Sequence, residues 1–357
     1  MAELLRAPAE IQFQEELEAL KNEDKKNPKP TNWQLSPRAV LTYIMGGKVG
    51  KKVITPKYIG QKRLMEMAIA TLATDRALLL YGLPGTAKSW VAEHLAAAIS
   101  GDSSRIVQGT AGTPEESIRY GWNYAILLAK GPTMDAVVPS PIMRAMQIGA
   151  IARVEELTRI GADVQDSLLT ILSEKALPIP ELNTTIRAVE GFNIIATANN
   201  KDKGVNEMSS ALKRRFNTVV LPVPASIKEE VEIVQRRLNT LTQKITMKQS
   251  HIEQIETIVT IFRELRNGLT QDGKTKLKVP SSTLSTAEAI SVMYQGITMA
   301  YWFGNGEISP EDISSALIGA IIKDPVQDTV IFKEYMETVM KERENWKALY
   351  KACKAQI

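Results

Sequence analysis

The sequence is poor in cysteine and histidine. Its 357 residues include one cysteine, Cys353, and two histidines, His94 and His251. A single cysteine excludes an intrachain disulfide, and so few thiol and imidazole ligands argue against a zinc site or a histidine-based catalytic triad. The scarcity of cysteine also predicts a reducing, cytoplasmic setting.

The chain also has no long apolar run and no strong charge of either sign. No segment reaches the roughly 18 uncharged apolar residues that a membrane span requires, and the first residues lack the apolar core of a secretion signal. Lysine and arginine number 44 against 40 acidic residues, which leaves a net charge of +4. This small excess gives no case for a nucleic-acid-binding surface. We therefore expect neither a membrane span nor a nucleic-acid partner.

What the sequence does contain is a candidate phosphate-binding loop. Residues 82–89, GLPGTAKS, follow the apolar run 77–81 and precede a helical pattern. The order of buried strand, glycine-bearing turn and helix surrounds a polyphosphate with backbone N–H groups and the positive end of a helix. Lys88 would reach the β- and γ-phosphates, and the Ser89 hydroxyl would bind Mg²⁺. Ala87 stands where the motif usually has glycine, and the alternative interpretation is a Gly-Pro turn before a core helix.

The chain divides by pattern into three parts. Residues 1–54 combine short helical patterns with a charged linker and predict a helical extension outside the main core. Over 55–224, β-type runs alternate with helical patterns, which indicates an α/β fold with a parallel five-stranded sheet between helices. The β-type runs are 77–81, 105–108, 150–154, 192–197 and 218–221. Residues 225–357 show amphipathic helical patterns, the last over 330–354, and predict a smaller all-α domain.

Polar residues follow two of the predicted strands. The third β-type run leads into Glu155 and Glu156, of which the second can polarise an attacking water while the first holds the Mg²⁺ shell. The fourth run leads to Asn199, with Asn200 in reserve, and an amide there can bond both the γ-phosphate and the water. Taken alone, an acidic pair is also typical of a helix start and Asn-Asn of a turn.

Two arginines end a helical pattern just before the last predicted strand. An arginine at this place lies away from its own phosphate loop and can enter the site of an adjacent subunit. There it would stabilise the transferring phosphoryl group, an effect worth roughly 10³–10⁵ in rate. Arg215 is the candidate and Arg214 the alternate. The other interpretation is a basic helix end that complements the helix dipole.

These elements, in this order and spacing, resemble the AAA+ ATPases over about residues 59–224, and within them the MoxR-like and dynein-related branch. The stretches 108–116, 156–169 and 199–216 carry the finer assignment. The resemblance implies a P-loop core followed by a helical lid. It assigns the Walker A, Walker B, sensor 1 and arginine-finger roles to Lys88 with Ser89, Glu155 with Glu156, Asn199, and Arg215. The residues expected to contact the nucleotide are Ile59, Gly60, Gly82, Pro84, Gly85, Thr86, Ala87, Lys88, Ser89 and Trp90.

The resemblance also implies a biochemical role. It predicts hydrolysis of ATP with Mg²⁺ by a homo-oligomeric ring, expected to be a hexamer, that remodels or activates a partner protein in a chaperone-like manner. Such a partner is often a protein with a von Willebrand A domain. Two insertions are expected, within 131–138 and as a hairpin within 175–190. Ala287 stands where the branch has its sensor 2 arginine, so either hydrolysis is slow or Arg187 or a neighbour's residue replaces it.

Two other functions remain open on the sequence alone. One is a nucleotide-driven subunit of a nucleic-acid machine, such as the GTPase of a restriction system, although neither its distinct motif nor a DNA-reading domain is present. The other is a nucleotide-gated scaffold with weak hydrolysis, which Ala287 and Glu155 favour and Glu156, Asn199 and Arg215 oppose.

Overall fold

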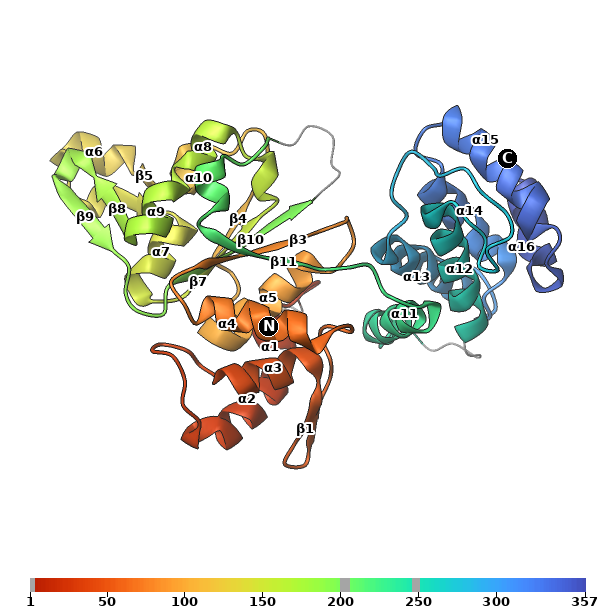
Figure 1. Cartoon of the computed structure of the whole chain (residues 1–357), viewed down its shortest axis with the longest axis horizontal. Helices are drawn as coiled ribbons and strands as arrows, with labels where there is room; N and C mark the ends of the chain where they lie inside the picture. Colours follow the sequence, from red (N-terminus) through yellow and green to blue (C-terminus); the bar gives the residue numbers. More distant parts are fainter. Residues whose placement is uncertain (1–3, 200–205, 246–250) are drawn as a thin grey trace. The chain divides into compact units, whose positions relative to one another are not determined.

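The computed structural model describes residues 4–199, 206–245 and 251–357. The chain divides into two compact units, which we call the N-terminal and the C-terminal unit and describe separately (Figure 1). The N-terminal unit comprises Met1–Leu83 and Ala87–Leu221, and the C-terminal unit comprises Pro84–Thr86 and Pro222–Ile357.

A parallel five-stranded sheet forms the centre of the N-terminal unit, with the strand order β11-β3-β10-β7-β4. The strands are β3 (Ala77–Gly82), β4 (Ile106–Gln108), β7 (Ile151–Glu155), β10 (Asn193–Asn199) and β11 (Phe216–Val220). Each corresponds to one of the five β-type runs of the sequence. The expected α/β fold with a parallel five-stranded sheet is therefore confirmed.

Helices cover both faces of this sheet (Figure 1). They are α4 (Lys62–Leu72) and α5 (Lys88–Ser100) on one face and α7 (Pro141–Ile148) and α9 (Leu168–Glu174) on the other. Side chains of β3 alternate between the two cores, because Leu78 and Leu80 pack with α4 and α5 whereas Leu79 packs with α7 and α9. A strand that is covered on both sides must be apolar at every position, which explains its uninterrupted apolar run.

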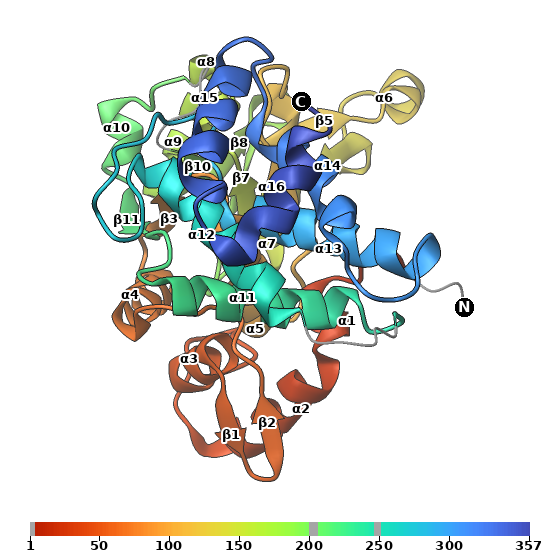
Figure 2. The same ribbon diagram turned by 90° about the vertical axis from the view of Figure 1, so that its right-hand side faces the viewer.

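Residues 9–54 belong to the core of the N-terminal unit, so the expectation of an extension outside the main core is wrong. They form α1 (Ala9–Gln12), α2 (Gln14–Glu23), α3 (Pro37–Met45) and the antiparallel hairpin of β1 (Gly47–Val49) and β2 (Lys52–Ile54). Tyr43 and Ile44 of α3 are fully buried and share one apolar cluster with Met65 of α4 and Leu95 of α5. The charged linker suggested a separate extension, but apolar residues on either side of it, such as Leu20 and Trp33, share the same cluster. Figure 2 shows α2 and α3 close to α5.

Two antiparallel hairpins lie beside the central sheet. One pairs β5 (Tyr120–Trp122) with β6 (Val137–Pro139) and carries α6 (Tyr124–Lys130) between its strands; the other pairs β8 (Ala176–Ile179) with β9 (Thr184–Arg187). Strand β6 overlaps the end of the first expected insertion, 131–138, and the second hairpin confirms the one expected within 175–190. The short α8 (Ala162–Asp166) and α10 (Ser210–Lys213) complete the unit.

The C-terminal unit is helical. Its helices are α11 (Ile227–Leu241), α12 (Ile252–Asn267), α13 (Thr286–Trp302), α14 (Pro310–Ile321), α15 (Gln327–Tyr335) and α16 (Lys347–Lys354). Ser285 and Ser309 are the N-caps of α13 and α14, and both helices have a reciprocal capping box. No helix of the described ranges is long and apolar enough to cross a bilayer.

The expected single helix over 330–354 is wrong. Helix α15 continues into a π-helical segment, Met336–Met340, and α16 starts only at Lys347. Arg343 lies between them with an extended backbone, and its guanidinium pairs with Glu264 at 2.6 Å and stacks 4.1 Å from the ring centroid of Trp346. These contacts with other parts of the unit require the break, and no local helical pattern shows them.

Candidate nucleotide-binding site

The carboxyl ends of β7 and β10 present their polar side chains toward α5. Ile151 and Ile195 face the core that contains α5, so the period of two along a strand points Arg153 and Glu155 of β7 to the same side. The same reasoning applies to β10, where Thr197 and Asn199 follow Ile195. Asn199 lies across from Gly82, the residue where β3 ends and the phosphate loop begins.

A buried hydrogen-bonded group joins α5 to β7. Ser89 Oγ at the start of α5 donates to Glu155 Oε2 at 2.6 Å, and Thr197 Oγ1 donates to the same oxygen at 2.6 Å. Arg153 donates to Glu155 Oε1 through Nε at 3.1 Å and Nη2 at 2.7 Å. Only 2% of Glu155 is exposed, and a carboxylate buried to this degree is stable only when it is paired and hydrogen-bonded in this way.

Sequence reasoning missed Arg153 and Thr197. The available signal was an arginine inside an otherwise apolar strand, two residues before Glu155 and hence on the same face. Its pairing with one carboxylate oxygen leaves the other oxygen directed at Ser89. The longer side chain of glutamate, compared with the usual aspartate, is therefore fixed at both ends of its carboxylate.

The donor set at Ser89 and Glu155 fits Mg²⁺ that arrives with a nucleotide. Both residues offer oxygen, the ligand that hard cations prefer. Within the described ranges, no cluster of three or more histidine, cysteine, aspartate or glutamate residues could hold a metal by itself. Mg²⁺ typically takes one or two protein oxygens and completes its shell with phosphate oxygens and water, so a two-residue donor set is sufficient.

Glu156 follows Glu155, the candidate metal ligand, and its backbone is strained. Its φ of 54° and ψ of 46° belong to the left-handed region, which costs an L-residue roughly 1–2 kcal/mol. Asn199 Nδ2 donates to both carboxylate oxygens, at 3.1 and 3.0 Å, and the backbone N–H of Glu156 donates to Thr197 Oγ1 at 3.0 Å. Backbone strain of this kind concentrates at functional sites, and here it places a carboxylate against an amide at the sheet edge.

The phosphate loop has the strand–turn–helix context that the sequence predicts. Lys88 is buried, and its ammonium donates to the carbonyl oxygens of Gly82 at 3.2 Å and Leu83 at 2.8 Å. Gly85 has a φ of +76°, and Ala87 takes a left-handed φ of 63° and ψ of 21° directly before α5. The motif usually has glycine at this position because the backbone is left-handed there. Ala87 adopts the same conformation at a cost in free energy.

The segment that leads to Ile59 and Gly60, two residues expected to contact the nucleotide, is attached to α5. Trp90 Nε1 donates to the carbonyl oxygen of Lys57 at 2.8 Å, and the chain continues to the half-buried Ile59 and the exposed Gly60. Burial lowers the pKa of Lys57, whose ammonium forms an ion pair with Glu16 of α2 at 2.5 Å. The N-terminal helices therefore fix this segment beside the helix that follows the phosphate loop.

The remaining candidates occupy surface positions. Arg215, half-buried after α10, donates from Nε to Ser173 Oγ at 2.9 Å and from Nη1 to the carbonyl oxygen of Ala211 at 3.0 Å. The exposed Arg214 side chain makes no hydrogen bond or ion pair with any residue that the structure describes. Arg187 is exposed on β9, and Asn200 lies outside the described residues. The structure thus brings together Lys88, Ser89, Glu155, Glu156 and Asn199 but not the arginines.

Comparison with known proteins gives the family. The model described as "AAA domain (dynein-related subfamily)" matches residues 77–216, and the model described as "YehL-like AAA+ ATPase C-terminal domain" matches residues 228–355. The uncharacterised protein YehL of Escherichia coli (strain K12) is 40% identical over 357 residues, which cover 98% of this chain and 97% of YehL. The chain belongs to the YehL-like AAA+ ATPases. The AAA+ family expected from the sequence, and its dynein-related branch, are confirmed, and nucleotide binding is a property of that family.

More distant matches were also found. The uncharacterised protein SH1500 of Staphylococcus haemolyticus (strain JCSC1435) is 28% identical over 150 residues, which cover 42% of this chain and 56% of that protein. Among solved structures, NtrX from Brucella abortus in complex with ADP aligns at 14% identity with a TM-score of 0.48. This alignment covers 83% of the present chain and 63% of NtrX, so the present chain spans less than two thirds of the length of NtrX.

The left-handed alanine of the Walker A loop gives a prediction about stability. Ala87→Gly is expected to raise the free energy of unfolding by about 0.5–1 kcal/mol, because glycine removes the cost of the left-handed conformation and only part of that gain is lost to its greater freedom in the unfolded chain. Ala97→Gly within α5 is the control and is expected to lower stability by more than about 1 kcal/mol, because the helix loses propensity and a buried methyl group. Urea unfolding monitored by tryptophan fluorescence measures both. A destabilised Ala87→Gly protein would contradict the conformational explanation.

Gly109 allows the chain after β4 to approach Glu155 and Glu156, the pair expected to form Walker B. Its N–H donates to the carbonyl oxygen of Glu155 at 2.8 Å, and a β-carbon at position 109 would lie 2.4 Å from the carbonyl oxygen of Glu156. Gly109→Ala must therefore displace the backbone that carries both carboxylates. At Gly112 in the same loop, a β-carbon would meet nothing within 4 Å.

We expect Gly109→Ala to lower the kcat of ATP hydrolysis by roughly 10²-fold, because a catalytic group displaced by about 1 Å loses that much rate. Gly112→Ala should retain wild-type turnover. Steady-state phosphate release at saturating ATP measures both variants, and equal rates for the two would show that the close backbone approach is unimportant for catalysis.

Proposed function

We propose that this AAA+ protein is a Mg²⁺-dependent ATPase. The observation that carries the proposal is the contact of the Asn199 amide with both oxygens of Glu156, beside the hydrogen bond between Ser89 and Glu155. The first pair provides a base and an amide that can orient water, and the second provides oxygen ligands for a metal. A phosphate loop alone would support binding, whereas the two pairs together support hydrolysis.

Each residue has a defined role in the proposed reaction. Lys88 leaves the carbonyl oxygens of Gly82 and Leu83 and neutralises the β- and γ-phosphates. Ser89 and Glu155 hold the metal, which when bound offsets the negative charge on the phosphates. Glu156 accepts a proton from the attacking water, and Asn199 holds that water in line. Water can join the contact with Asn199, because each oxygen of an ionised carboxylate accepts more than one hydrogen bond.

We further propose that the active unit is a homo-oligomeric ring, expected to be a hexamer, in which Arg215 completes the site of a neighbouring subunit. The support is its position at the end of α10, where Ser173 and Ala211 hold the guanidinium near the surface, away from the Walker residues of its own chain. Arg214 is the alternate. The resemblance supports a partner protein that is remodelled or activated, such as one with a von Willebrand A domain, and the cysteine content supports a cytoplasmic setting.

A nucleotide-gated scaffold with weak hydrolysis is the second candidate. The observation that favours it is Ala287, which lies exposed in the first turn of α13 where the branch has its sensor 2 arginine. Alanine offers no charge to a phosphate. The two candidates differ in turnover and not in binding.

Phosphate release measured against protein concentration, with ATP in the presence of Mg²⁺ or of excess EDTA, tests the proposal. We expect release to require Mg²⁺ and the rate per subunit to rise with concentration as rings assemble. A rate that is negligible at every concentration, while ATP still binds, would support the scaffold. A rate per subunit that does not depend on concentration would contradict a site shared between subunits.

A further inference from the structure

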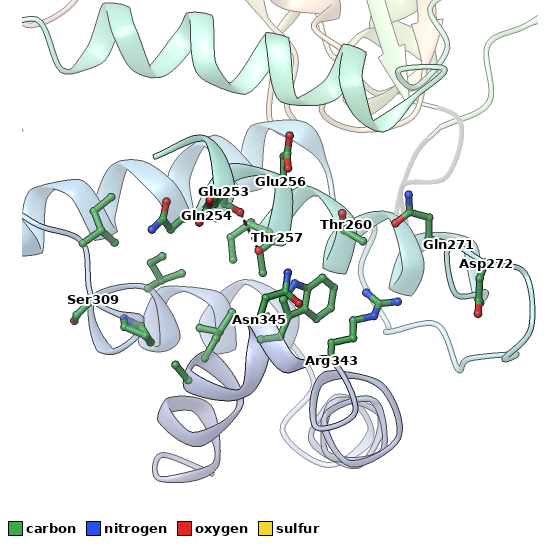
Figure 3. A pocket seen from close by; sticks show the side chains of 17 residues that line it. Glu253, Gln254, Glu256, Thr257, Thr260, Gln271, Asp272, Ser309, Arg343 and Asn345 are labelled. Atoms are coloured by element: carbon green, nitrogen blue, oxygen red, sulfur yellow. Dashed lines mark hydrogen bonds between the residues drawn. The ribbon is translucent and has the colours of Figure 1, made fainter. Parts of the chain in front are cut away.

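The C-terminal unit contains a groove to which none of the nucleotide-site residues contributes. Its volume is about 950 Å³, and the seventeen residues that line it come from α12, the loop that follows α12, the start of α14, and the turn leading into α16 (Figure 3). All of them fall within residues 228–355, the part matched by the YehL-like C-terminal domain. None of the residues assigned to the Walker, sensor or arginine-finger roles lines this groove.

The floor of the groove is apolar, and one of its walls follows a helix. Ile258, Ile313, Trp346 and Leu349 line it and are buried. The part of α12 over 253–260 that forms one wall is about 10 Å long, and Figure 3 shows the groove continuing past this helix to the following loop. A groove that runs along a helix accommodates an extended or helical polypeptide segment better than a compact molecule.

The rim of the groove is acidic. Glu253 and Glu256 are exposed on α12 and form no ion pair with residues inside the described ranges. Asp272 is exposed beyond the end of that helix, and its only such contact is a loose one of 4.0 Å with Lys274. Hydrogen bonds from the Thr270 hydroxyl and the Lys274 backbone lower the pKa of Asp272, so its carboxylate stays ionised at neutral pH.

The one cation among the lining residues does not offset this charge. Arg343 is already paired with Glu264 at 2.6 Å and stacked over Trp346. Gln254 adds a further acceptor, because its Oε1 is buried in the wall and has no hydrogen-bond partner among the residues described. The three carboxylates and the Gln254 oxygen are acceptors that a donor-rich cationic side chain would satisfy.

We propose that this groove binds a segment of a partner polypeptide that carries lysine or arginine between apolar residues. The apolar side chains would contact the accessible apolar part of the lining, which includes Ile308, Pro310 and Ala348. The basic groups would pair with Glu253, Glu256 and Asp272 along the rim. Charge complementarity of this kind selects a partner and accelerates its association. Recognition at the groove requires no nucleotide, so the proposal does not depend on ATP hydrolysis.

The test uses the full-length protein and a phage-displayed library of random dodecapeptides. Enriched peptides are synthesised with a fluorescent label, and their Kd values are measured by anisotropy against three proteins. The first is the wild type, and the second is the groove variant Glu253→Gln/Glu256→Gln/Asp272→Asn. The third is the control Glu232→Gln/Glu307→Gln/Glu342→Gln, which removes the same number of charges from exposed positions outside the groove. Thermal unfolding confirms that both variants fold.

We expect enriched peptides to combine basic and apolar residues, and their Kd to rise at least about tenfold in the groove variant while the control stays near wild type. Enrichment of acidic or uncharged peptides, or of none, overturns the proposal. So does an equal effect of both variants, which would show a general charge effect. If the groove variant instead changes the oligomeric state of the protein, the occupant is a second copy of this chain and the proposal is wrong.

Discussion

Replacing Arg215 with alanine is expected to lower phosphate release by the assembled protein by roughly 10³–10⁵-fold and to leave ATP binding nearly unchanged. In the proposed mechanism the guanidinium stabilises charge that develops on the transferring phosphoryl group, so its loss should affect the transition state and not the bound substrate. The two hydrogen bonds to Ser173 and Ala211 limit the rotamers of Arg215 before a neighbour arrives. Turnover above the assembly concentration and the Kd of a fluorescent ATP analogue together measure the effect.

Arg214→Ala is the matched control for this prediction. The two arginines are adjacent and both carry one positive charge, but only the side chain of Arg215 is held by described residues. We expect Arg214→Ala to keep most of the wild-type turnover. A large loss of turnover in Arg214→Ala with normal turnover in Arg215→Ala would assign the arginine-finger role to Arg214. Normal turnover in both variants would show that neither residue is an arginine finger.

Replacing Glu156 with glutamine is expected to lower the kcat of ATP hydrolysis by about 10²–10⁴-fold. Glutamine has the same shape and can still accept a hydrogen bond from Asn199, but it cannot take a proton from water. The left-handed backbone at this position is retained, because the change lies at the end of the side chain. Single-turnover phosphate release with the variant in excess over ATP separates the chemical step from binding and product release.

Glu174→Gln on α9 controls for the loss of one negative charge, since this side chain is exposed on the helix. Its turnover should equal that of the wild type. Unchanged turnover in Glu156→Gln would show that Glu156 is not the base and would favour the nucleotide-gated scaffold.

Much of the fold was accessible from the sequence because the central strands are buried on both faces. A run such as Ala77–Gly82 is apolar at nearly every position, and this signal does not depend on distant contacts. The N-terminal helices were wrongly predicted to lie outside the core. The polar residues between Leu20 and Trp33 are typical of a linker, and the packing of Tyr43 and Ile44 with the core depends on contacts distant in sequence. The break before α16 was missed for a similar reason, because it depends on Arg343 contacting a different helix.

The residues of the nucleotide site could be predicted from the sequence, but their geometry could not. Lys88, Ser89 and the acidic pair follow from a motif in its proper context, as does the amide at the end of β10. The role of Arg153 did not follow, because an arginine in a strand belongs to no motif and only the pleat brings it to Glu155. The left-handed backbones of Ala87 and Glu156 are also invisible in single-residue propensities, and the usual glycine at position 87 was the only indication.

The central claim is that each catalytic site is shared between two subunits, and mixing two inactive variants tests it most directly. Arg215→Ala chains retain Glu156, and Glu156→Gln chains retain the arginine. When equal amounts are allowed to co-assemble, a site with its own glutamate and a neighbour's arginine arises in about a quarter of positions, and the mixture should recover about that fraction of wild-type turnover. Turnover that stays at the average of the two separate variants, although mixed rings form, would contradict a shared site.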